Sequence, residues 1–298
     1  MLIRAATAKT NASRKSDHIK VDPIAGTMGA EISGVDVRDM SAAAFEEIKT
    51  ALADHIAVFI LGQDLSVEEM ERFTSRFGAF GDDPFIKGMD EHPHVLHVKK
   101  EAKEMLPVVF GGLWHSDWSF LEAPPAYTIL HAKEIPPFGG DTLYANCYLA
   151  YEALSVEFRR ILDGLTALHS AQRGYGEDMK RVYAFLENMT VKTGGEASTR
   201  IEEHPLVRTH PVTKRKALYV NPVYTVGIKG MDEEESTPIL QFLARHMTHE
   251  NFTCRFRWKP GAIAMWDNRA CLHLPISDYL GFRREMYRTT VEGERPYL

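Results

Sequence analysis

The chain has little cysteine, no long apolar run and no excess of positive charge. Only Cys147, Cys254 and Cys271 occur among its 298 residues. Such an odd, widely separated set indicates a reducing compartment rather than a disulfide framework. No apolar run approaches the roughly 20 residues of a membrane span, and the net charge of −6 argues against nucleic acid as a partner. These absences predict a cytoplasmic protein with neither a membrane nor a nucleic-acid partner.

The first twenty residues are basic and polar and lack the apolar stretch of a secretory signal. We expect residues 1–17 to form a disordered tail. A chain of this length, 44% of it hydrophobic, can bury roughly three quarters of its unfolded surface. Because we find no internal repeat and no clear linker, we expect residues 18–298 to form a single domain.

Short strands are indicated more often than helices along the chain. Ser41 is expected to cap a helix, Ser66 and Glu69 form a capping box for another, and further helices are predicted over residues 150–162 and from Ser236 to about His246. Many short strands with few helices predict a mainly β fold with flanking helices (α+β), a barrel or jelly roll. The pattern weakens over residues 173–200, which we interpret as an insertion that could form a lid.

Two distant segments offer the ligands of a metal site. His115 and Asp117 are two positions apart, and on a strand such residues point to the same face. Aromatic side chains at Trp118 and nearby positions would wall the site. With His273 they make a set of two imidazoles and one carboxylate that leaves coordination positions open, as is typical of non-haem Fe(II) oxygenases.

Other arrangements of the 13 histidines are also conceivable. His92, His94 and His97 form a denser cluster, although a solvated loop explains them more simply. Two other classes of protein remain open. One is a zinc hydrolase or isomerase that holds an activated water, and the other is a non-catalytic scaffold that has kept the fold.

Two arginines follow His273 on one predicted strand. Arg284 and Arg288 are four positions apart and therefore share a face of that strand. Two cations that face one pocket are costly to bury unpaired, so the pattern favours anion binding. The alternative is a surface strand whose arginines pair with acidic side chains.

Ordered motifs along nearly the whole chain resemble the taurine dioxygenase and 2,4-dichlorophenoxyacetate dioxygenase family of Fe(II)- and 2-oxoglutarate-dependent oxygenases. The matching segments lie between residues 18 and 297 and include Gly29–Asp36, Trp114–Asp117, Gly139–Thr142, Trp266–Asn268 and Arg283–Arg288. The resemblance implies a double-stranded β-helix, a relative of the jelly roll. It also implies a homo-oligomer, either a dimer or a tetramer.

Carried over position by position, the resemblance implies that His115, Asp117 and His273 bind Fe(II). Arg284 would bind the distal carboxylate of 2-oxoglutarate, because a guanidinium is a planar, always charged, bidentate partner. The other implied cosubstrate contacts are the Thr142 hydroxyl and the aromatic Trp266. The implied reaction consumes O2 and 2-oxoglutarate, yields succinate and CO2, and hydroxylates a C–H bond, and ascorbate is expected to stimulate it.

The substrate is less closely defined. Arg288 matches a position that meets the anionic group of the substrate in several family members. Trp118 and Phe120 favour an apolar or aromatic substrate body, and Tyr224 could add a hydroxyl. Taurine enzymes carry His-Pro-Val-Tyr where this chain has residues 83–86, beginning with Asp83, and Asn where it has Gly111. We therefore expect a small anion, an aryloxyalkanoate, alkyl sulfate or sulfonate, with taurine itself as the alternative.

Overall fold

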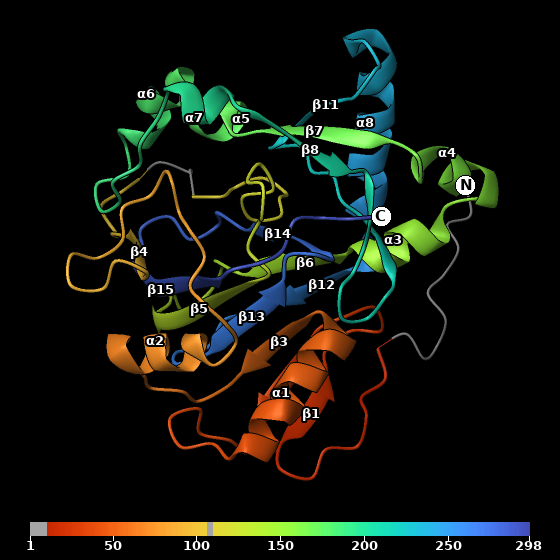
Figure 1. The fold of residues 1–298 in the computed structure, drawn as a ribbon. Coiled ribbons are helices and arrows are strands. Elements are labelled where there is room, and N and C mark those ends of the chain that lie inside the picture. Colours follow the sequence, from red (N-terminus) through yellow and green to blue (C-terminus); the bar gives the residue numbers. More distant parts are fainter. Residues whose placement is uncertain (1–10, 106–109) are drawn as a thin grey trace.

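The computed structural model describes residues 11–105 and 110–298. Two β-sheets face each other at its centre, and helices lie outside them (Figure 1). The larger sheet has the order β1-β2-β3-β13-β5-β15-β4. Its strands are β1 (Lys20–Pro23), β2 (Ala30–Ser33), β3 (Ala57–Ile60), β4 (Leu96–Lys100), β5 (Tyr127–Glu134), β13 (Ile263–Asp267) and β15 (Arg284–Val291).

The facing sheet has the order β12-β6-β14. Phe59 of β3 stacks on Phe256 of β12 with ring centroids 3.9 Å apart, so the main core lies between the two sheets. The strands of this sheet are β6 (Thr142–Asn146), β12 (Thr253–Phe256) and β14 (Cys271–Pro275). Smaller sheets above it contain β7 (Thr166–Ser170), β8 (Ile201–Pro205), β9 (Val207–Thr209), β10 (Lys216–Leu218) and β11 (Thr225–Ile228). This sheet-rich arrangement confirms the predicted jelly roll with flanking helices.

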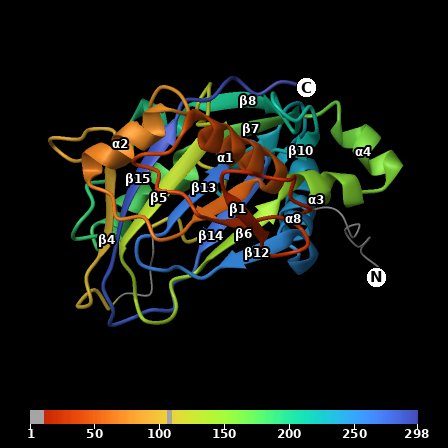
Figure 2. The same ribbon diagram turned by 90° about the horizontal axis from the view of Figure 1, so that it is seen from below.

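Helices α1 (Ala42–His55) and α2 (Val67–Ser75) cover the outer face of the larger sheet (Figures 1 and 2). Both begin as predicted. The Ser41 hydroxyl accepts the Ala44 N–H at 3.1 Å, and Ser66 forms a capping box with Glu69. These caps satisfy amide groups that have no partner within the helix. The buried apolar side of α1 then packs on β2, β3 and β13.

Two predicted helices are wrong in their bounds. The helix expected over residues 150–162 is two helices, α3 (Cys147–Ala153) and α4 (Val156–Leu162), because Leu154 is extended and Ser155 caps α4. Helix α8 (Glu233–Met247) begins before the predicted Ser236, because Asp232 forms a capping box with Glu235. Two short helices, α6 (Lys180–Tyr183) and α7 (Glu196–Thr199), lie within the predicted insertion, and α5 (Gln172–Tyr175) begins one residue before it.

The expected disordered tail, residues 1–17, lies partly outside the described residues. Within the described part, Asn11 is buried, and its amide donates to the carbonyl oxygens of Ala25 at 2.6 Å and Gly29 at 3.0 Å. Its side-chain oxygen also contacts the ring of His55. Asn11 therefore contacts the body of the domain, and disorder of residues 1–17 stays a prediction.

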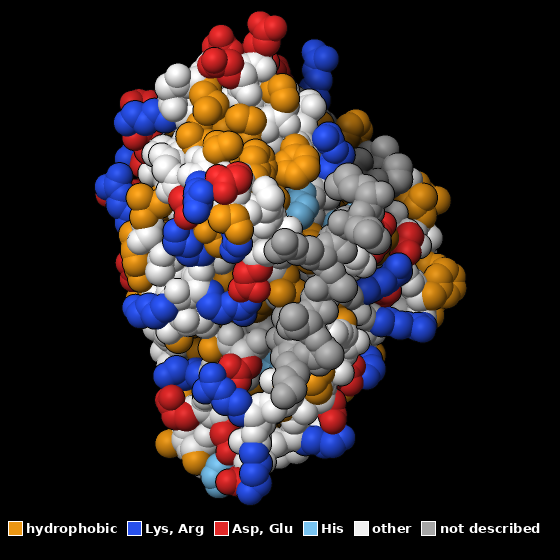
Figure 3. Space-filling model, turned by 90° about the vertical axis from the view of Figure 1, so that its right-hand side faces the viewer, with side chains coloured by type: hydrophobic (Ala, Val, Ile, Leu, Met, Phe, Trp, Pro, Cys, Tyr) orange, Lys and Arg blue, Asp and Glu red, His pale blue; other side chains and the backbone are white. Residues whose placement is uncertain are grey.

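The surface carries charges of both signs. On the face shown in Figure 3, basic and acidic side chains are interspersed. Some of these charges form ion pairs along a helix, such as Arg160 Nη1 and Glu157 Oε1, which lie 2.8 Å apart. Among the described residues, no helix is both long enough and apolar enough to cross a bilayer.

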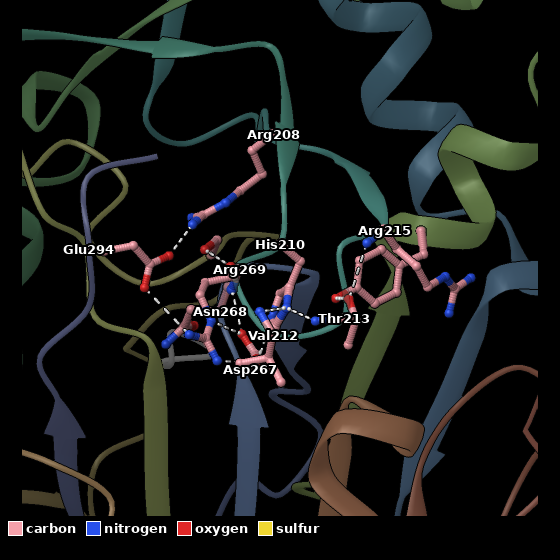
Figure 4. A network of polar contacts seen from close by, with 11 residues as sticks. Arg208, His210, Val212, Thr213, Arg215, Asp267, Asn268, Arg269 and Glu294 are labelled. Carbon is pink, nitrogen blue, oxygen red and sulfur yellow. Dashed lines mark hydrogen bonds and ion pairs between the residues drawn. The ribbon is translucent and has the colours of Figure 1, made fainter. Parts of the chain in front are cut away.

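A buried polar network fixes the turn that follows β13 (Figure 4). The carboxylate of Asp267 accepts hydrogen bonds from the Arg269 side chain at 2.8 and 2.7 Å and from His210 Nε2 at 2.9 Å. Glu294, near the C-terminal end of the chain, pairs with Arg269 and Arg208. All these groups except Glu294 are buried. The network therefore ties the C-terminal segment and the β9–β10 region to one turn of the barrel.

We expect Asp267→Ala to lower the free energy of unfolding by about 3 to 5 kcal/mol, because it removes the buried carboxylate that pairs with Arg269 and His210. Urea unfolding followed by circular dichroism would measure the change. Asp36→Ala, which removes an exposed pair with Arg38, is the control and should change stability little. Equal effects of the two substitutions would contradict a structural role for the network.

Candidate metal and cosubstrate site

Three residues that could share one metal ion meet between the sheets. The ligand atoms of His115, Asp117 and His273 all lie within 4.8 Å of one another, and the three residues are buried. Asp117 Oδ1 is 3.5 Å from His115 Nε2 and 3.8 Å from His273 Nε2. Two imidazole nitrogens and one carboxylate oxygen around a common point form a donor set that suits Fe(II).

The backbone that carries these ligands differs from the prediction. His115 is not on a regular strand but forms one isolated bridge with His273, with N–H to O distances of 3.1 and 2.8 Å. The chain then turns at Asp117–Phe120, where Trp118 has a φ of 40° that a strand does not allow. The expectation of two strand positions on one face was therefore wrong. The turn at Asp117–Phe120, and not the alternation of side chains along a strand, places Asp117 close to His115.

Hydrogen bonds orient the His115 ring. Its Nδ1 donates to the carbonyl of Leu113 at 2.6 Å, so that the other ring nitrogen, Nε2, is directed at Asp117. The ring of Trp266 packs on that of His273 with centroids 4.6 Å apart. Burial, followed by the nearby His115, lowers the pKa of His273. Burial thus favours the neutral form of the His273 imidazole, which is the form that binds metal.

The two oxygens of Asp117 have different partners. Oδ2 accepts the hydroxyl of Thr128 at 2.6 Å, whereas Oδ1 faces the two histidines and lies 2.7 Å from Arg288 Nη2. Burial alone would raise the pKa of Asp117, but Arg288 and the histidines lower it below its ordinary value. The carboxyl group is therefore ionised and able to act as a ligand.

Arg284 is a second buried arginine with donors that lack a partner. It is 4% exposed, and its Nε and Nη2 atoms have no hydrogen-bond partner. Its guanidinium lies 5.6 Å from the ring of Trp258 and 5.9 Å from that of Tyr279. Burial lowers its pKa. Unpaired buried donors of this kind are costly, so these residues fit a dicarboxylate cosubstrate whose distal carboxylate would satisfy them.

Thr142 and Trp266, the other two predicted cosubstrate contacts, have different hydrogen-bond partners. The Thr142 oxygen accepts the Trp258 indole N–H at 3.0 Å, so its own proton remains available to a ligand. Trp266 is 2% exposed and donates its indole N–H to Asn268 Oδ1 at 3.0 Å. Its geometry supports His273 rather than presenting a polar group to a cosubstrate.

A cavity of about 350 Å³ opens beside the metal ligands. Arg288, Trp118 and Tyr224 line it together with His115 and Asp117. The Arg288 guanidinium stacks on the Trp118 ring at 4.3 Å. Its Nε and Nη2 make no hydrogen bond of suitable geometry. The cavity therefore contains a buried cation that forms an ion pair with Asp117 but makes no hydrogen bond of suitable geometry through Nε or Nη2.

Phe120 and the insertion take up different places around this cavity. Phe120 is not among the lining residues but packs behind Tyr224, with centroids 4.9 Å apart. The region predicted as an insertion contributes much of the remaining wall. Its lining residues are Arg173, Gly174, Tyr175, Met179, Val182 and Tyr183.

Asp83 lies on the far side of Arg288. Its Oδ1 accepts the backbone N–H groups of Phe85 at 3.2 Å and Ile86 at 2.9 Å, while Oδ2 is buried without a partner. It lines a second cavity, of about 200 Å³, together with Arg288 and Trp118. Burial raises the pKa of Asp83 to about 6, although Arg288 opposes the shift.

The fold and site are those of a 2-oxoglutarate-dependent dioxygenase, and comparison with known families agrees. The family model of the taurine catabolism dioxygenases, described as the TauD, TfdA family, matches residues 20–290. The chain therefore belongs to this family, whose members include α-ketoglutarate-dependent dioxygenases. The matches do not support the alternatives of a zinc hydrolase or a scaffold.

Individual relatives are similar over most of their length. A sulfate ester dioxygenase from Pseudomonas putida, dependent on α-ketoglutarate, is 34% identical over 282 residues, which cover 93% of this chain and 91% of that protein. A taurine dioxygenase structure from Burkholderia xenovorans is 35% identical, with a TM-score of 0.77 and coverage of 94% and 93%. The structure of AAD-2 in complex with Mn(II) and N-oxalylglycine is 26% identical, with a TM-score of 0.73 and coverage of 94% and 99%.

The sequence interpretation gave no role to two polar residues beside Asp117. Thr128 is fully buried in β5, and Asn268 lies in the turn after β13. A threonine within the apolar run of a buried strand is a weak signal. Asn268 lay within a recognised motif, but its contact with the Asp117 region depends on the three-dimensional fold.

Proposed function

We propose that the chain is an Fe(II)- and 2-oxoglutarate-dependent dioxygenase that hydroxylates a small organic sulfate ester or sulfonate with an apolar chain. His115, Asp117 and His273 would hold the metal. Arg284 and the Thr142 hydroxyl would bind the distal carboxylate of 2-oxoglutarate. The observation that supports the substrate class most directly is Arg288, a buried cation at the triad end of a largely apolar cavity. Its Nη2 lies 2.7 Å from Asp117 Oδ1, but its Nε and Nη2 make no hydrogen bond of suitable geometry.

The composition of the cavity wall favours an anion with an apolar body. Met179, Val182 and Val223 line it, with the rings of Tyr175 and Tyr183. Bound Fe(II), with O2 and 2-oxoglutarate, supplies the oxidising chemistry, and ascorbate would keep the metal reduced. The protein's own part is to hold the substrate anion on Arg288 so that the adjacent C–H bond faces the triad, and to exclude water.

Two features argue against taurine as the substrate. Asp117 is the only carboxylate among the described residues that line the main cavity, so the ammonium group of taurine has no free acidic partner there. Gly111 has a φ of 74°, and a Cβ at this position would lie 3.0 Å from His115 Cε1. An asparagine at position 111 would therefore press on a ligand ring unless the loop changed its conformation.

Hydroxylation at the carbon that bears the sulfate would give an unstable product that breaks down to an aldehyde and sulfate. The test is succinate formation with Fe(II), ascorbate and 2-oxoglutarate across alkyl sulfates, alkanesulfonates, aryloxyalkanoates and taurine. We expect alkyl sulfates or alkanesulfonates to stimulate turnover, with stoichiometric release of sulfate or sulfite. Stimulation by taurine alone, or by aryloxyalkanoates alone, would contradict this substrate assignment.

Arg288→Gln should raise the KM for the sulfate or sulfonate at least about 30-fold, because loss of one partner of a buried charge pair costs ~2 kcal/mol or more. The KM for 2-oxoglutarate should change little. Since Arg288 also contacts Asp117, Mn(II) binding by calorimetry should be measured on the same variant. Arg173→Gln is the matched control, because Arg173 lines the same cavity but its guanidinium donates to the carbonyl of Thr225 at 2.9 Å. Equal effects of both substitutions would refute a specific anion site at Arg288.

A further inference from the structure

We propose that Thr128 and Asn268 are positioning residues that orient the Asp117 carboxylate so that a single oxygen, Oδ1, faces the metal. The inference rests on the proposed assignment of His115, Asp117 and His273 as metal ligands. Neither residue reaches the cavity wall. Both therefore act on the reaction through Asp117, without touching cosubstrate or substrate.

The hydroxyl of Thr128 makes the direct contact. It donates to Asp117 Oδ2 at 2.6 Å, and both residues are 2% exposed or less. A short hydrogen bond to a carboxylate is stronger than one between neutral groups. It removes Oδ2 from the set of free ligand atoms, and Oδ1 remains directed at the two histidine Nε2 atoms.

The direction of the Thr128 hydrogen bond is imposed by Asn268. Its side-chain oxygen accepts the Trp266 indole N–H at 3.0 Å and the Asp117 backbone N–H at 3.3 Å. Its amide nitrogen therefore faces Thr128 Oγ1, to which it donates at 2.9 Å. If the amide were flipped, its NH2 group would face the N–H groups of Trp266 and Asp117, which are also donors. With one lone pair of Thr128 occupied in this way, its proton is left for Asp117.

The turn that carries Asn268 is itself held from outside. Asp267 and Arg269, the residues on either side, belong to the buried network described above (Figure 4). The backbone carbonyl of Asn268 accepts the hydroxyl of Ser116, beside the ligand, at 2.9 Å. The carboxylate is thus fixed by a chain of hydrogen bonds that ends in a salt-bridged turn. Such outer contacts tune metal affinity.

The test compares Thr128→Val, which keeps the shape but removes the hydroxyl, with Thr128→Ser, which keeps the hydroxyl. Mn(II) affinity is measured by calorimetry, and the coordination geometry by the visible spectrum of the Co(II) protein. Thr74→Val is the matched control, because Thr74 is equally buried and its hydroxyl contacts Met70 and Thr289, away from the ligands. His115→Ala serves as the control for the metal site itself.

We expect Thr128→Val to weaken Mn(II) binding about 10- to 100-fold and to change the Co(II) spectrum, while Thr128→Ser and Thr74→Val resemble the wild type. Wild-type affinity in Thr128→Val, or an equal loss in Thr128→Ser, would overturn the positioning role. If His115→Ala bound Mn(II) as tightly as the wild type, the metal assignment would fail first, and the inference with it.

Discussion

Replacement of His115 by alanine is expected to abolish 2-oxoglutarate turnover and metal binding without unfolding the protein. The imidazole supplies one of three ligand atoms, and its loss should reduce metal affinity by more than the ~100-fold that loss of an outer contact can cost. The backbone hydrogen bonds between His115 and His273 do not need the side chain. Calorimetric titration with Mn(II) and succinate assays would measure both effects.

The rival histidine cluster supplies the control for this prediction. His92 pairs with Glu71 at 2.8 Å, and His97 pairs with Glu285 at 2.6 Å. These contacts occupy the imidazoles in ordinary ion pairs or hydrogen bonds. His92→Ala should therefore retain wild-type metal binding. If His92→Ala lost the metal while His115→Ala kept it, the site would have to be moved to the cluster.

The second large effect concerns 2-oxoglutarate. Arg284→Ala is expected to raise its KM by about 30-fold to several thousand-fold, because an unpaired carboxylate in a buried pocket costs ~2 to 5 kcal/mol. Arg284→Lys should recover part of the loss, since a lysine restores the charge but not the bidentate geometry. The measurement is the dependence of succinate formation on 2-oxoglutarate at saturating Fe(II).

The adjacent arginine is a close control for Arg284. Arg283 is partly exposed and pairs with Glu101, Glu134 and Glu285. Replacement of Arg283 by alanine removes the same charge one residue away but leaves the Arg284 guanidinium in place. The KM for 2-oxoglutarate should therefore stay near the wild-type value. If Arg284→Ala left the KM for 2-oxoglutarate unchanged, the distal carboxylate would have to bind another cation. Arg288, which contacts Asp117, would then be the first candidate.

Elements with strong local signals were predictable from the sequence. The helix caps at Ser41 and Ser66 are both present. The strand around His273 was not predicted, because β14 is short and its hydrogen-bond partner, β6, is distant in sequence. Likewise β4, which was expected to be loop, forms by pairing with β15. Local sequence propensity does not predict strands that form only through pairing with a distant segment.

The candidate ligands were recognised by residue type and family motif, whereas the residues that hold them in position were not. The geometry that brings Asp117 to His115 depends on an irregular turn, with Trp118 at positive φ. Thr128 and Asn268 acquire a common neighbour only when β5 and β13 pair side by side. Polar contacts of this kind are set by the packed structure and have no periodic signature in the sequence.

The bridge between His115 and His273 also bears on the order of events during synthesis. His273, Arg284 and Arg288 all follow His115 by more than 150 residues, so a polypeptide that has emerged only as far as Asp117 has neither the complete triad nor its anion sites. Domains fold as units once their distant segments are available. On the proposed assignment, the complete metal and anion site forms only after β14 and β15 have been synthesised.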